Sequence, residues 1–374
     1  MSDNVLTILG IQDREDAITN LLAYCFNSSG EFRVALLRSI CGQETTPTER
    51  WTAYTRLSLA GAGVPDLVLH GGDGPSGRLI VIENKLKADE GEDQTARYCS
   101  PEAIAALSRR FDVKRPPTFV FLTLFPDQRP NAGPPWVTTT YRQLLDVFEA
   151  NSLPSDSIGS KLLSDWRDLM ADFYDSAVVT DEDIFLEKLR GDRGLEGNYL
   201  YFISFMQDLN LANRLTLEDW FRSSQTGRRY YGAVISKADW HPEEMKPDLD
   251  GRWHLDAVRH FNIHVEPQFN VLTGVLNLYI HYEINPYRPD RWVTANVDFD
   301  ERRAYGERRQ RFIGAFANRV PLDVVIAGGC NQIGKATCDF VGSTTEAVRH
   351  TLERLIETIS LRIDESLQQL AGQP

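Results

Sequence analysis

Three residues with reactive side chains, Asp66, Glu83 and Lys85, stand in a pattern that can serve chemistry. Glu83 and Lys85 lie two positions apart in the apolar stretch RLIVIENKL (78–86), which favours a β-strand. Because side chains alternate between the two faces of a strand, both point to one face and Asn84 points to the other.

A predicted hairpin brings Asp66 to the same place. Residues 64–70 (VPDLVLH) favour a short strand with Asp66 in the middle, and GGDGPSG (71–77) is a dense turn signal. A tight turn there pairs 64–70 with 78–86 and places Asp66 next to Glu83. Two carboxylates and one lysine are therefore expected to converge on one surface.

The converging trio has the composition of a hydrolytic metal site. Two close carboxylates repel each other unless a cation lies between them, and Mg²⁺ prefers such oxygen ligands while keeping several waters. A bound divalent metal lowers the pKa of a coordinated water and polarises a phosphate oxygen. A nearby lysine can orient or help deprotonate that water, and it offsets charge on the attacked phosphate. Asp66 and Glu83 are therefore the predicted metal ligands for phosphodiester hydrolysis, with Lys85 as the lysine.

The surrounding sequence predicts a framework for the trio in the order helix, three strands, helix, strand, helix. The first helix has Asp13 as its predicted N-cap and is interrupted by the NSSG segment. The fourth strand is continuously apolar, which is typical of a buried strand. The predicted helices cover 13–42, 92–110 and 141–150, and the predicted strands cover 51–60, 64–70, 78–86 and 118–125.

With these residues in place, the sequence resembles the PD-(D/E)xK nuclease superfamily. The tripeptide VPD ending at Asp66, a 16-residue interval and the tripeptide ENK match its motif, and the order of elements is similar to its restriction-endonuclease-like α/β core. The resemblance implies that Asp66 and Glu83 bind Mg²⁺ or Mn²⁺ and that Lys85 is the catalytic lysine. It also implies that the main-chain carbonyl of Asn84 is a further metal ligand.

Two more positions extend the resemblance, which covers roughly residues 10–150. Glu15, with Asp16 as its rival, matches an acidic metal ligand in the first helix of many members. Gln94 and Tyr98 match the QxxxY pattern of the RecB-like branch, which implies that Gln94 assists catalysis and that Tyr98 contacts substrate. The sequence is most similar to prokaryotic members with a C-terminal extension, many of which are thought to act in defence against phage.

Simpler interpretations exist for each of these residues. Glu83 and Lys85 could form a surface ion pair across strands, although their apolar strand disfavours this because a solvated pair contributes little. Glu15 could complement the helix dipole, and Gln94 and Tyr98 could lie on an ordinary amphipathic helix face. The fold could also persist as a catalytically silent binding or regulatory subunit of a larger complex, which metal binding to the isolated protein would distinguish.

A glycine-rich segment, DVVIAGGCNQIGKAT (323–337), suggests a weaker alternative, nucleotide hydrolysis. Gly329, Gly334 and Lys335 have the spacing of a phosphate-binding loop after an apolar strand. Ala336, however, stands where Ser or Thr must hold Mg²⁺, and too few residues follow for the further βα units of such a domain. A turn between strands is the simpler interpretation.

The C-terminal half offers two further groups. His260 and His264 have the spacing of a helical metal pair, but their segment favours a strand, so the seven histidines are predicted to be structural or surface residues. Residues 301–319 hold six Arg against two Glu. Arg308 and Arg309 are the predicted phosphate contacts of this segment, and a solvated helix face is the alternative.

Composition limits the classes of function and the cellular compartment that the sequence allows. The net charge is −13, so any affinity for nucleic acid needs a local basic surface. Five scattered cysteines without a CxxC pair indicate a reducing compartment. No apolar run reaches the length of a membrane span. A cytoplasmic protein without membrane contact is therefore predicted.

The length of 374 residues predicts more than one domain. A nuclease domain is expected at 1–150, a linker and helical connector at 151–225, and an α+β domain of unknown role at 226–374. Helix is expected over most of 161–222 and at 301–319 and 344–370, and alternating segments such as 292–300 favour strands. DNA is the predicted partner, and the C-terminal domain is expected to select substrate or to bind a protein partner or a second copy.

Overall fold

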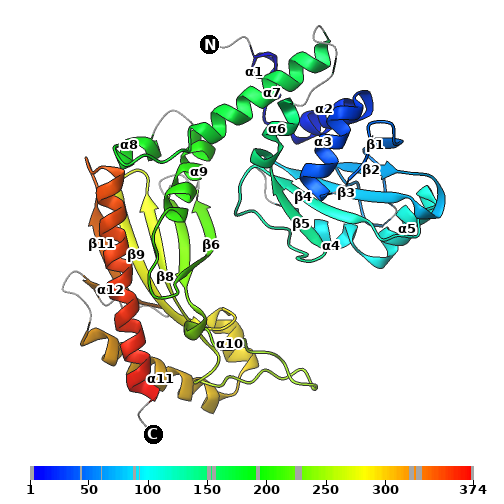
Figure 1. The fold of residues 1–374 in the computed structure, drawn as a ribbon. Helices are drawn as coiled ribbons and strands as arrows, with labels where there is room; N and C mark the ends of the chain where they lie inside the picture. The colour runs from blue at the N-terminus through cyan, green and yellow to red at the C-terminus, as the bar shows by residue number, and fades with distance from the viewer. Residues whose placement is uncertain are drawn as a thin grey trace. The chain divides into compact units, whose positions relative to one another are not determined.

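The computed structural model folds the chain into two compact units, Met1–Ser176 and Ala177–Pro374. Each is a mixed α and β unit built on its own β-sheet (Figure 1). The structure describes residues 4–42, 44–59, 61–86, 90–91, 93–149, 153, 157–190, 194–223, 230–319, 324–325 and 331–371. None of the helices within these ranges is long and apolar enough to cross a membrane.

The first unit is built on a five-stranded mixed sheet in the order β1-β2-β3-β4-β5. β1, β2 and β3 are antiparallel neighbours, whereas β4 runs parallel to β3 and β5 runs parallel to β4. The predicted hairpin is confirmed, because β2 pairs with β3 in a register that sets Leu67 opposite Ile82. The strands are β1 Trp51–Thr55, β2 Leu67–Gly71, β3 Arg78–Lys85, β4 Thr118–Thr123 and β5 Trp136–Thr140.

Helices cover both faces of this sheet. α2 packs against β1 and β3, and α3 packs against β4. On the other face, Ala103 and Leu107 of α5 join a buried apolar cluster with Val81 and Phe119. The helices are α1 Val5–Ile8, α2 Glu15–Ser28, α3 Gly30–Cys41, α4 Gln94–Tyr98, α5 Pro101–Phe111, α6 Leu145–Glu149 and α7 Ile158–Asp175, with 3-10 turns η1 Gly74–Ser76 and η2 Tyr141–Leu144.

Three local predictions for the first unit were wrong. The predicted helix 92–110 is two helices, because Pro101 has no N–H with which to continue α4 and Ser100 instead caps α5. The sequence predicted no strand between 118–125 and the helix at 141–150, yet Trp136–Thr140 forms β5 and pairs with β4 at the sheet edge. The N-cap of α2 is Arg14, which makes no side-chain capping bond, rather than Asp13.

The second unit is built on a six-stranded sheet in the order β10-β11-β9-β8-β7-β6. Neighbouring strands are antiparallel throughout the part of the sheet that the structure describes. The hairpin of β8 and β9 lies at its centre and sets His264 opposite His281. The strands are β6 Thr216–Ser223, β7 Tyr230–Ser236, β8 Phe261–Asn270, β9 Val275–Ile284, β10 Val324–Val325 and β11 Gln332–Asp339.

Aromatic side chains build the core between this sheet and its helices. Tyr199 of α9 packs against Tyr231 of β7, and Phe312 of α11 packs against Tyr282 of β9. The long helix α12 runs along the sheet (Figure 1) and has a buried apolar face. The helices are α8 Phe185–Arg190, α9 Gly194–Gln207, α10 Asp290–Asn296, α11 Phe299–Ala317 and α12 Thr345–Ala371, with a 3-10 turn η3 Ala238–Trp240.

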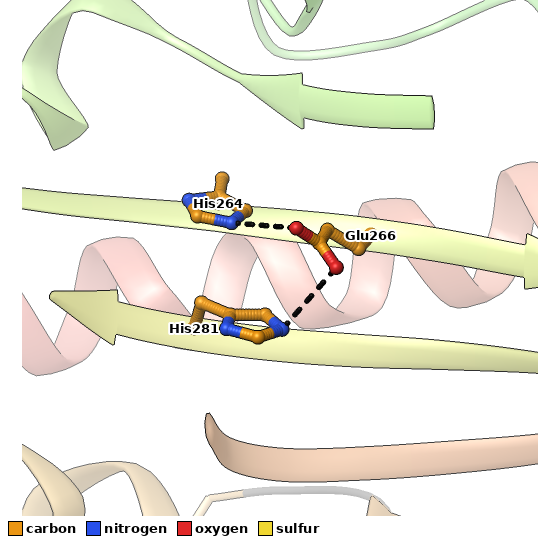
Figure 2. Close-up of side chains that lie close together, drawn as sticks. All are labelled: His264, Glu266 and His281. Carbon is orange, nitrogen blue, oxygen red and sulfur yellow. Dashed lines mark hydrogen bonds and ion pairs between the residues drawn. The ribbon is translucent and has the colours of Figure 1, made fainter. Parts of the chain in front are cut away.

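The residues of β8 and β9 that alternate with the core residues make a polar sheet face. His264 and Glu266 of β8 lie together with His281 of β9 on this face (Figure 2). Three titratable side chains from two strands are thus neighbours. Of the three, the sequence pattern pointed only to His264, as the partner of His260.

Several predictions for residues 151–374 need correction. The helical expectation for 161–222 holds to Gln207 but fails at β6, which pairs with β7 as an edge strand. The alternating residues 292–300 form no strand: residues 292–296 lie in α10, and 299–300 begin α11, whose start the Asp298 side chain caps. The helices predicted at 301–319 and 344–370 are confirmed by α11 and α12. The sequence predicted a separate connector at 151–225, whereas the structure assigns α7 to the first unit and α8 and α9 to the second.

Candidate active site

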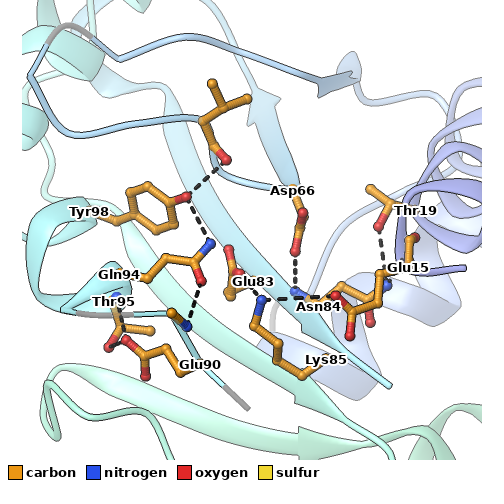
Figure 3. Close-up of polar contacts among 12 residues, drawn as sticks. Glu15, Thr19, Asp66, Glu83, Asn84, Lys85, Glu90, Gln94, Thr95 and Tyr98 are labelled. Carbon is orange, nitrogen blue, oxygen red and sulfur yellow. Dashed lines mark hydrogen bonds and ion pairs between the residues drawn. The ribbon is translucent and has the colours of Figure 1, made fainter. Parts of the chain in front are cut away.

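The strand β3 carries the centre of the predicted site at its C-terminal end. Glu83 and Lys85 follow Val81 on the sheet face that α4 and α5 cover, so their side chains point toward that face as the alternation predicts. Asp66 lies one residue before β2 rather than within the strand, and the hairpin register, extended by one residue, sets it opposite Glu83. The predicted convergence of the three residues is therefore present (Figure 3).

Short polar contacts fix the trio. The backbone N–H of Asn84 donates a hydrogen bond to Asp66 Oδ2 at 2.8 Å, which ties the residue before β2 to β3. Lys85 Nζ forms an ion pair with Glu83 Oε1 at 2.6 Å. Apart from this ion pair, neither carboxylate oxygen of Glu83 has a hydrogen-bond partner among the described residues, although both are buried. Glu83 Oε2 is thus available for a further ligand, whereas Oε1 contacts Lys85.

Burial governs the protonation of these groups. Burial, reinforced by the charge of Asp66, raises the pKa of Glu83 to about 8. Burial also raises the pKa of Asp66, although the hydrogen bond from Asn84 opposes this. For Lys85 burial lowers the pKa, but the charge of Glu83 and its hydrogen bond outweigh burial, so the net shift is upward. Lys85 is therefore an ammonium group at neutral pH, beside two carboxyl groups whose charged forms burial disfavours.

Glu15, the first residue of α2, reaches into the same cluster. Its Oε1 accepts a hydrogen bond from the backbone N–H of Leu86 at 2.9 Å, and its Oε2 lies 3.9 Å from Lys85 Nζ. Asp16 instead lines a neighbouring cavity of about 290 Å³ together with Asp66. Glu15 is therefore the acidic residue of the first helix that contacts the lysine, and Asp16 borders the open side of Asp66.

Asn84 anchors the end of β3 on the opposite face. Its side-chain Nδ2 donates to Thr19 Oγ1 of α2 at 3.1 Å, and its Oδ1 accepts from the Tyr141 hydroxyl at 2.6 Å (Figure 3 shows Thr19). The sequence does not predict either partner, because neither Thr19 nor Tyr141 lies within a motif. Asn84 thus holds the strand end, and with it Glu83 and Lys85, between α2 and η2.

Gln94 and Tyr98 lie beside the cluster but bond mainly to each other and to the backbone. Gln94 Nε2 donates to the Tyr98 hydroxyl at 3.1 Å, and Gln94 Oε1 accepts from the N–H of Gly91 at 3.3 Å. The Tyr98 hydroxyl donates to the carbonyl of Val64 at 2.9 Å, two residues before Asp66. Both predicted side chains are therefore near the site, where they position the segment that carries Asp66.

Glu90 is a further positioning residue that the sequence did not reveal. Its Oε1 accepts hydrogen bonds at 2.6 Å from both the N–H and the hydroxyl of Thr95, and its Oε2 accepts from the N–H of Asn131 at 2.6 Å. One carboxylate thus joins the start of α4 to the segment between β4 and β5. A glutamate four residues before a helix is a weak capping signal, so only the structure identifies it.

The donor set fits a hard divalent cation. Asp66, Glu83 and Glu15 each supply carboxylate oxygens, and Glu83 and Glu15 both contact Lys85. Among the described residues, the ligand atoms that already lie together at metal-binding distances are those of His264, Glu266 and His281, so a cation beside Lys85 would require the carboxylates there to move closer together. Mg²⁺ and Mn²⁺ prefer such oxygens, and a divalent charge would offset the repulsion that raises the pKa values of Asp66 and Glu83.

The residues singled out in the second unit are not part of this cluster. Arg309 Nε donates to the carbonyl of Tyr282 at 3.2 Å, and the Arg308 guanidinium lies over the Phe261 ring, so both are half-buried against the sheet. Gly334 and Lys335 lie within β11 rather than in a loop before a helix, and Gly329 lies outside the described residues. The phosphate-binding loop therefore lacks its strand–loop–helix context.

Comparison with known proteins gives no match: no family model, no curated protein and no solved structure matches this chain. What the site can do follows from its side chains.

Proposed function

We propose that this chain is a metal-dependent nuclease that hydrolyses phosphodiester bonds, with DNA as its substrate. The observation that carries the proposal is the convergence of Asp66, Glu83 and Lys85, held by the hydrogen bond from Asn84 and the ion pair of Lys85 with Glu83. A buried carboxylate pair beside a protonated lysine is costly to the folded state, and phosphodiester hydrolysis is a chemistry that uses all three groups. An antiparallel hairpin followed by a parallel strand, with helices on both faces, also supports a restriction-endonuclease-like core.

In this proposal the roles divide between holding a cation and handling the phosphate. Asp66 and Glu83 would hold Mg²⁺ or Mn²⁺, with Glu15 and the Asn84 carbonyl as further ligands. When bound, that cation would supply Lewis acidity toward a phosphate oxygen and a more acidic water. Lys85, which stays protonated, donates a hydrogen bond to the attacking water or to the phosphate and stabilises negative charge there. Gln94 and Tyr98 keep the segment before Asp66 in place.

The deciding experiment is cleavage of supercoiled and linear DNA with Mg²⁺ or Mn²⁺. Lys85→Ala and Asp66→Ala should lower the cleavage rate at least about a hundredfold, because each removes a group that stabilises charge in the transition state. Lys114→Ala, at an exposed lysine after α5, is the matched control and should cleave like the wild type. Unchanged activity in Lys85→Ala would remove the basis of the proposal.

Metal binding, measured on the same variants, distinguishes the nuclease from a catalytically silent regulatory module. Metal binding that Asp66→Ala abolishes, without cleavage of DNA or RNA by the wild type, would favour that module. Absence of both metal binding and cleavage would contradict a metal-dependent role for the cluster.

A further inference from the structure

The polar face of the second sheet carries a second group of metal-ligating side chains. His264 and Glu266 lie two residues apart on β8, and His281 and Glu283 lie two residues apart on β9, so all four point to the same face. The register sets His264 directly opposite His281. Their rings stack with centroids 4.9 Å apart and an interplanar angle of 5°. The pairing of two strands thus assembles a site that neither segment shows alone.

The ligand atoms converge at distances that suit a small cation. His264 Nε2 lies 3.2 Å from Glu266 Oε1, and His281 Nε2 lies 3.4 Å from Glu266 Oε2 (Figure 2). One nitrogen or oxygen atom from each of the three residues lies within 4.8 Å of the other two. Ligands about 2.0–2.1 Å from a tetrahedral Zn²⁺ lie roughly 3.4 Å from one another, so closing the cluster around zinc needs only small movements.

The cluster is poorly satisfied without a cation. His264 Nδ1 is buried without a hydrogen-bond partner among the described residues, and the buried His281 Nε2 has only its 3.4 Å contact with Glu266 Oε2. His264 is only 5% exposed, and the side chains of Glu266 and Glu283 are 19% and 13% exposed. Lys335 of β11, which pairs with Tyr279 in the sheet, lies over the Tyr279 ring. Glu266 and Glu283 bring two carboxylates to this face, and a bound divalent ion would offset their repulsion.

We propose that His264, Glu266 and His281 bind a zinc ion through His264 Nε2, a Glu266 carboxylate oxygen and His281 Nε2. Two imidazoles and one carboxylate favour Zn²⁺ over Mg²⁺, which prefers an all-oxygen octahedral shell. Three protein ligands leave a fourth position for a water molecule or a substrate group.

Glu283 lies next to His264, on the Nδ1 side of its ring. Its Oε1 lies 4.0 Å from His264 Nδ1, the ring nitrogen that does not face Glu266. In zinc sites a ligating histidine usually donates its other N–H to a carboxylate or carbonyl, which fixes the tautomer of the ring. At 4.0 Å Glu283 does not yet accept this hydrogen bond, and a shift of either side chain as the metal binds would let it do so and keep His264 Nε2 free for the metal.

The test is zinc binding by the full chain after treatment with a chelator and removal of the chelator. The wild type should take up one zinc ion per chain, as measured by elemental analysis, and Asp66→Asn should do the same because Asp66 is not among the proposed zinc ligands. Glu266→Gln keeps the size of the side chain and should lose zinc. Glu283→Gln should weaken zinc binding by about 10–100-fold, the usual effect of losing such a partner. His350→Ala, at an exposed histidine of α12, is the control and should bind like the wild type.

Substitution with Co²⁺ gives a second readout that does not depend on a variant folding. The wild type should give the visible absorption of a cobalt site with nitrogen and oxygen ligands, and added Zn²⁺, but not Mg²⁺, should remove it. The proposal is overturned if the wild type takes up no zinc, or if folded Glu266→Gln and His281→Ala, checked by circular dichroism, bind zinc as tightly as the wild type.

Discussion

At the scale of single residues, Glu83 is a buried carboxyl group next to a second carboxylate, which disfavours its charged form. Its pKa is raised from the usual 4.5 to about 8, so between these values the folded state binds a proton that the unfolded state has released. Stability of the metal-free protein therefore falls as pH rises through this window. A cation at Asp66 and Glu83 offsets the repulsion and competes with the proton.

A pH-dependent metal effect follows. Below pH 8, each unit of acidification should weaken binding of Mn²⁺ to the first unit by up to about tenfold, because the metal must displace one proton. Thermal unfolding with and without Mn²⁺ at a series of pH values measures this, and Asp66→Asn should lose the Mn²⁺ shift at every pH. An Mn²⁺ shift that stays constant from pH 6 to pH 8 would contradict the assignment of Glu83 as a ligand.

Tyr141 tests the anchoring of β3. Tyr141→Phe removes the hydrogen bond of 2.6 Å to Asn84 Oδ1 and leaves a buried acceptor unpaired. The free energy of unfolding of the first unit should fall by about 1–3 kcal/mol. Denaturant unfolding measures it, with Tyr24→Phe as control because the Tyr24 side chain is about half exposed. Equal stability of both variants would show that the Asn84 side chain finds another partner.

At the scale of elements, the segment before β2 depends on a glycine. Gly63 has φ +112°, and an added Cβ would lie 3.3 Å from the Tyr98 ring, whose hydroxyl holds the Val64 carbonyl. The segment that delivers Asp66 therefore packs closely on α4 at a backbone conformation that side chains disfavour.

Gly63→Ala should destabilise the first unit by about 1–3 kcal/mol and lower the cleavage rate, since it displaces the segment that carries Asp66. Gly61→Ala is the matched control, because Gly61 also has a positive φ but no atom lies within 4 Å of its added Cβ. Denaturant unfolding and DNA cleavage of the two variants separate backbone strain from the contact with Tyr98. A larger loss in Gly61→Ala would exclude the contact as the cause.

Elements with a strong local signal were predictable, whereas those that depend on long-range pairing were not. The apolar run of β3 and the turn before it predicted the hairpin and placed Glu83 and Lys85 on one face of the strand. β5 and β6 are edge strands with many polar residues, so their strand state depends on pairing with β4 and β7 rather than on their own pattern.

The same distinction separates the two candidate sites. Asp66 and Glu83 are joined by one short hairpin, so the turn signal brought them together. His264 and His281 also belong to one hairpin, but their approach depends on the register of β8 with β9, and a slip of one residue would place them on opposite faces. Thr19 and Tyr141 reach Asn84 from distant segments, and Glu90 joins α4 to the segment between β4 and β5, contacts that the sequence alone does not specify.

At the scale of the whole molecule, two units with separate sheets carry two candidate sites of different ligand chemistry. Carboxylate oxygens dominate the first, and imidazole nitrogens dominate the second. Different metals should therefore stabilise different units, because a ligand that binds only the folded state slows the opening of the structure around its site.

Hydrogen exchange followed by mass spectrometry resolves this by segment. Mn²⁺ at a hundred times its Kd should slow exchange in 67–85 by up to about a hundredfold, and Zn²⁺ should do the same in 261–284. Asp66→Asn should lose the first effect and keep the second, and Glu266→Gln should show the reverse. Each variant is thus the control for the other, since each leaves the other unit's ligands intact. Protection of both segments by one metal in both variants would mean that neither cluster discriminates by ligand type, and the assignment of separate cations to the two units would fail.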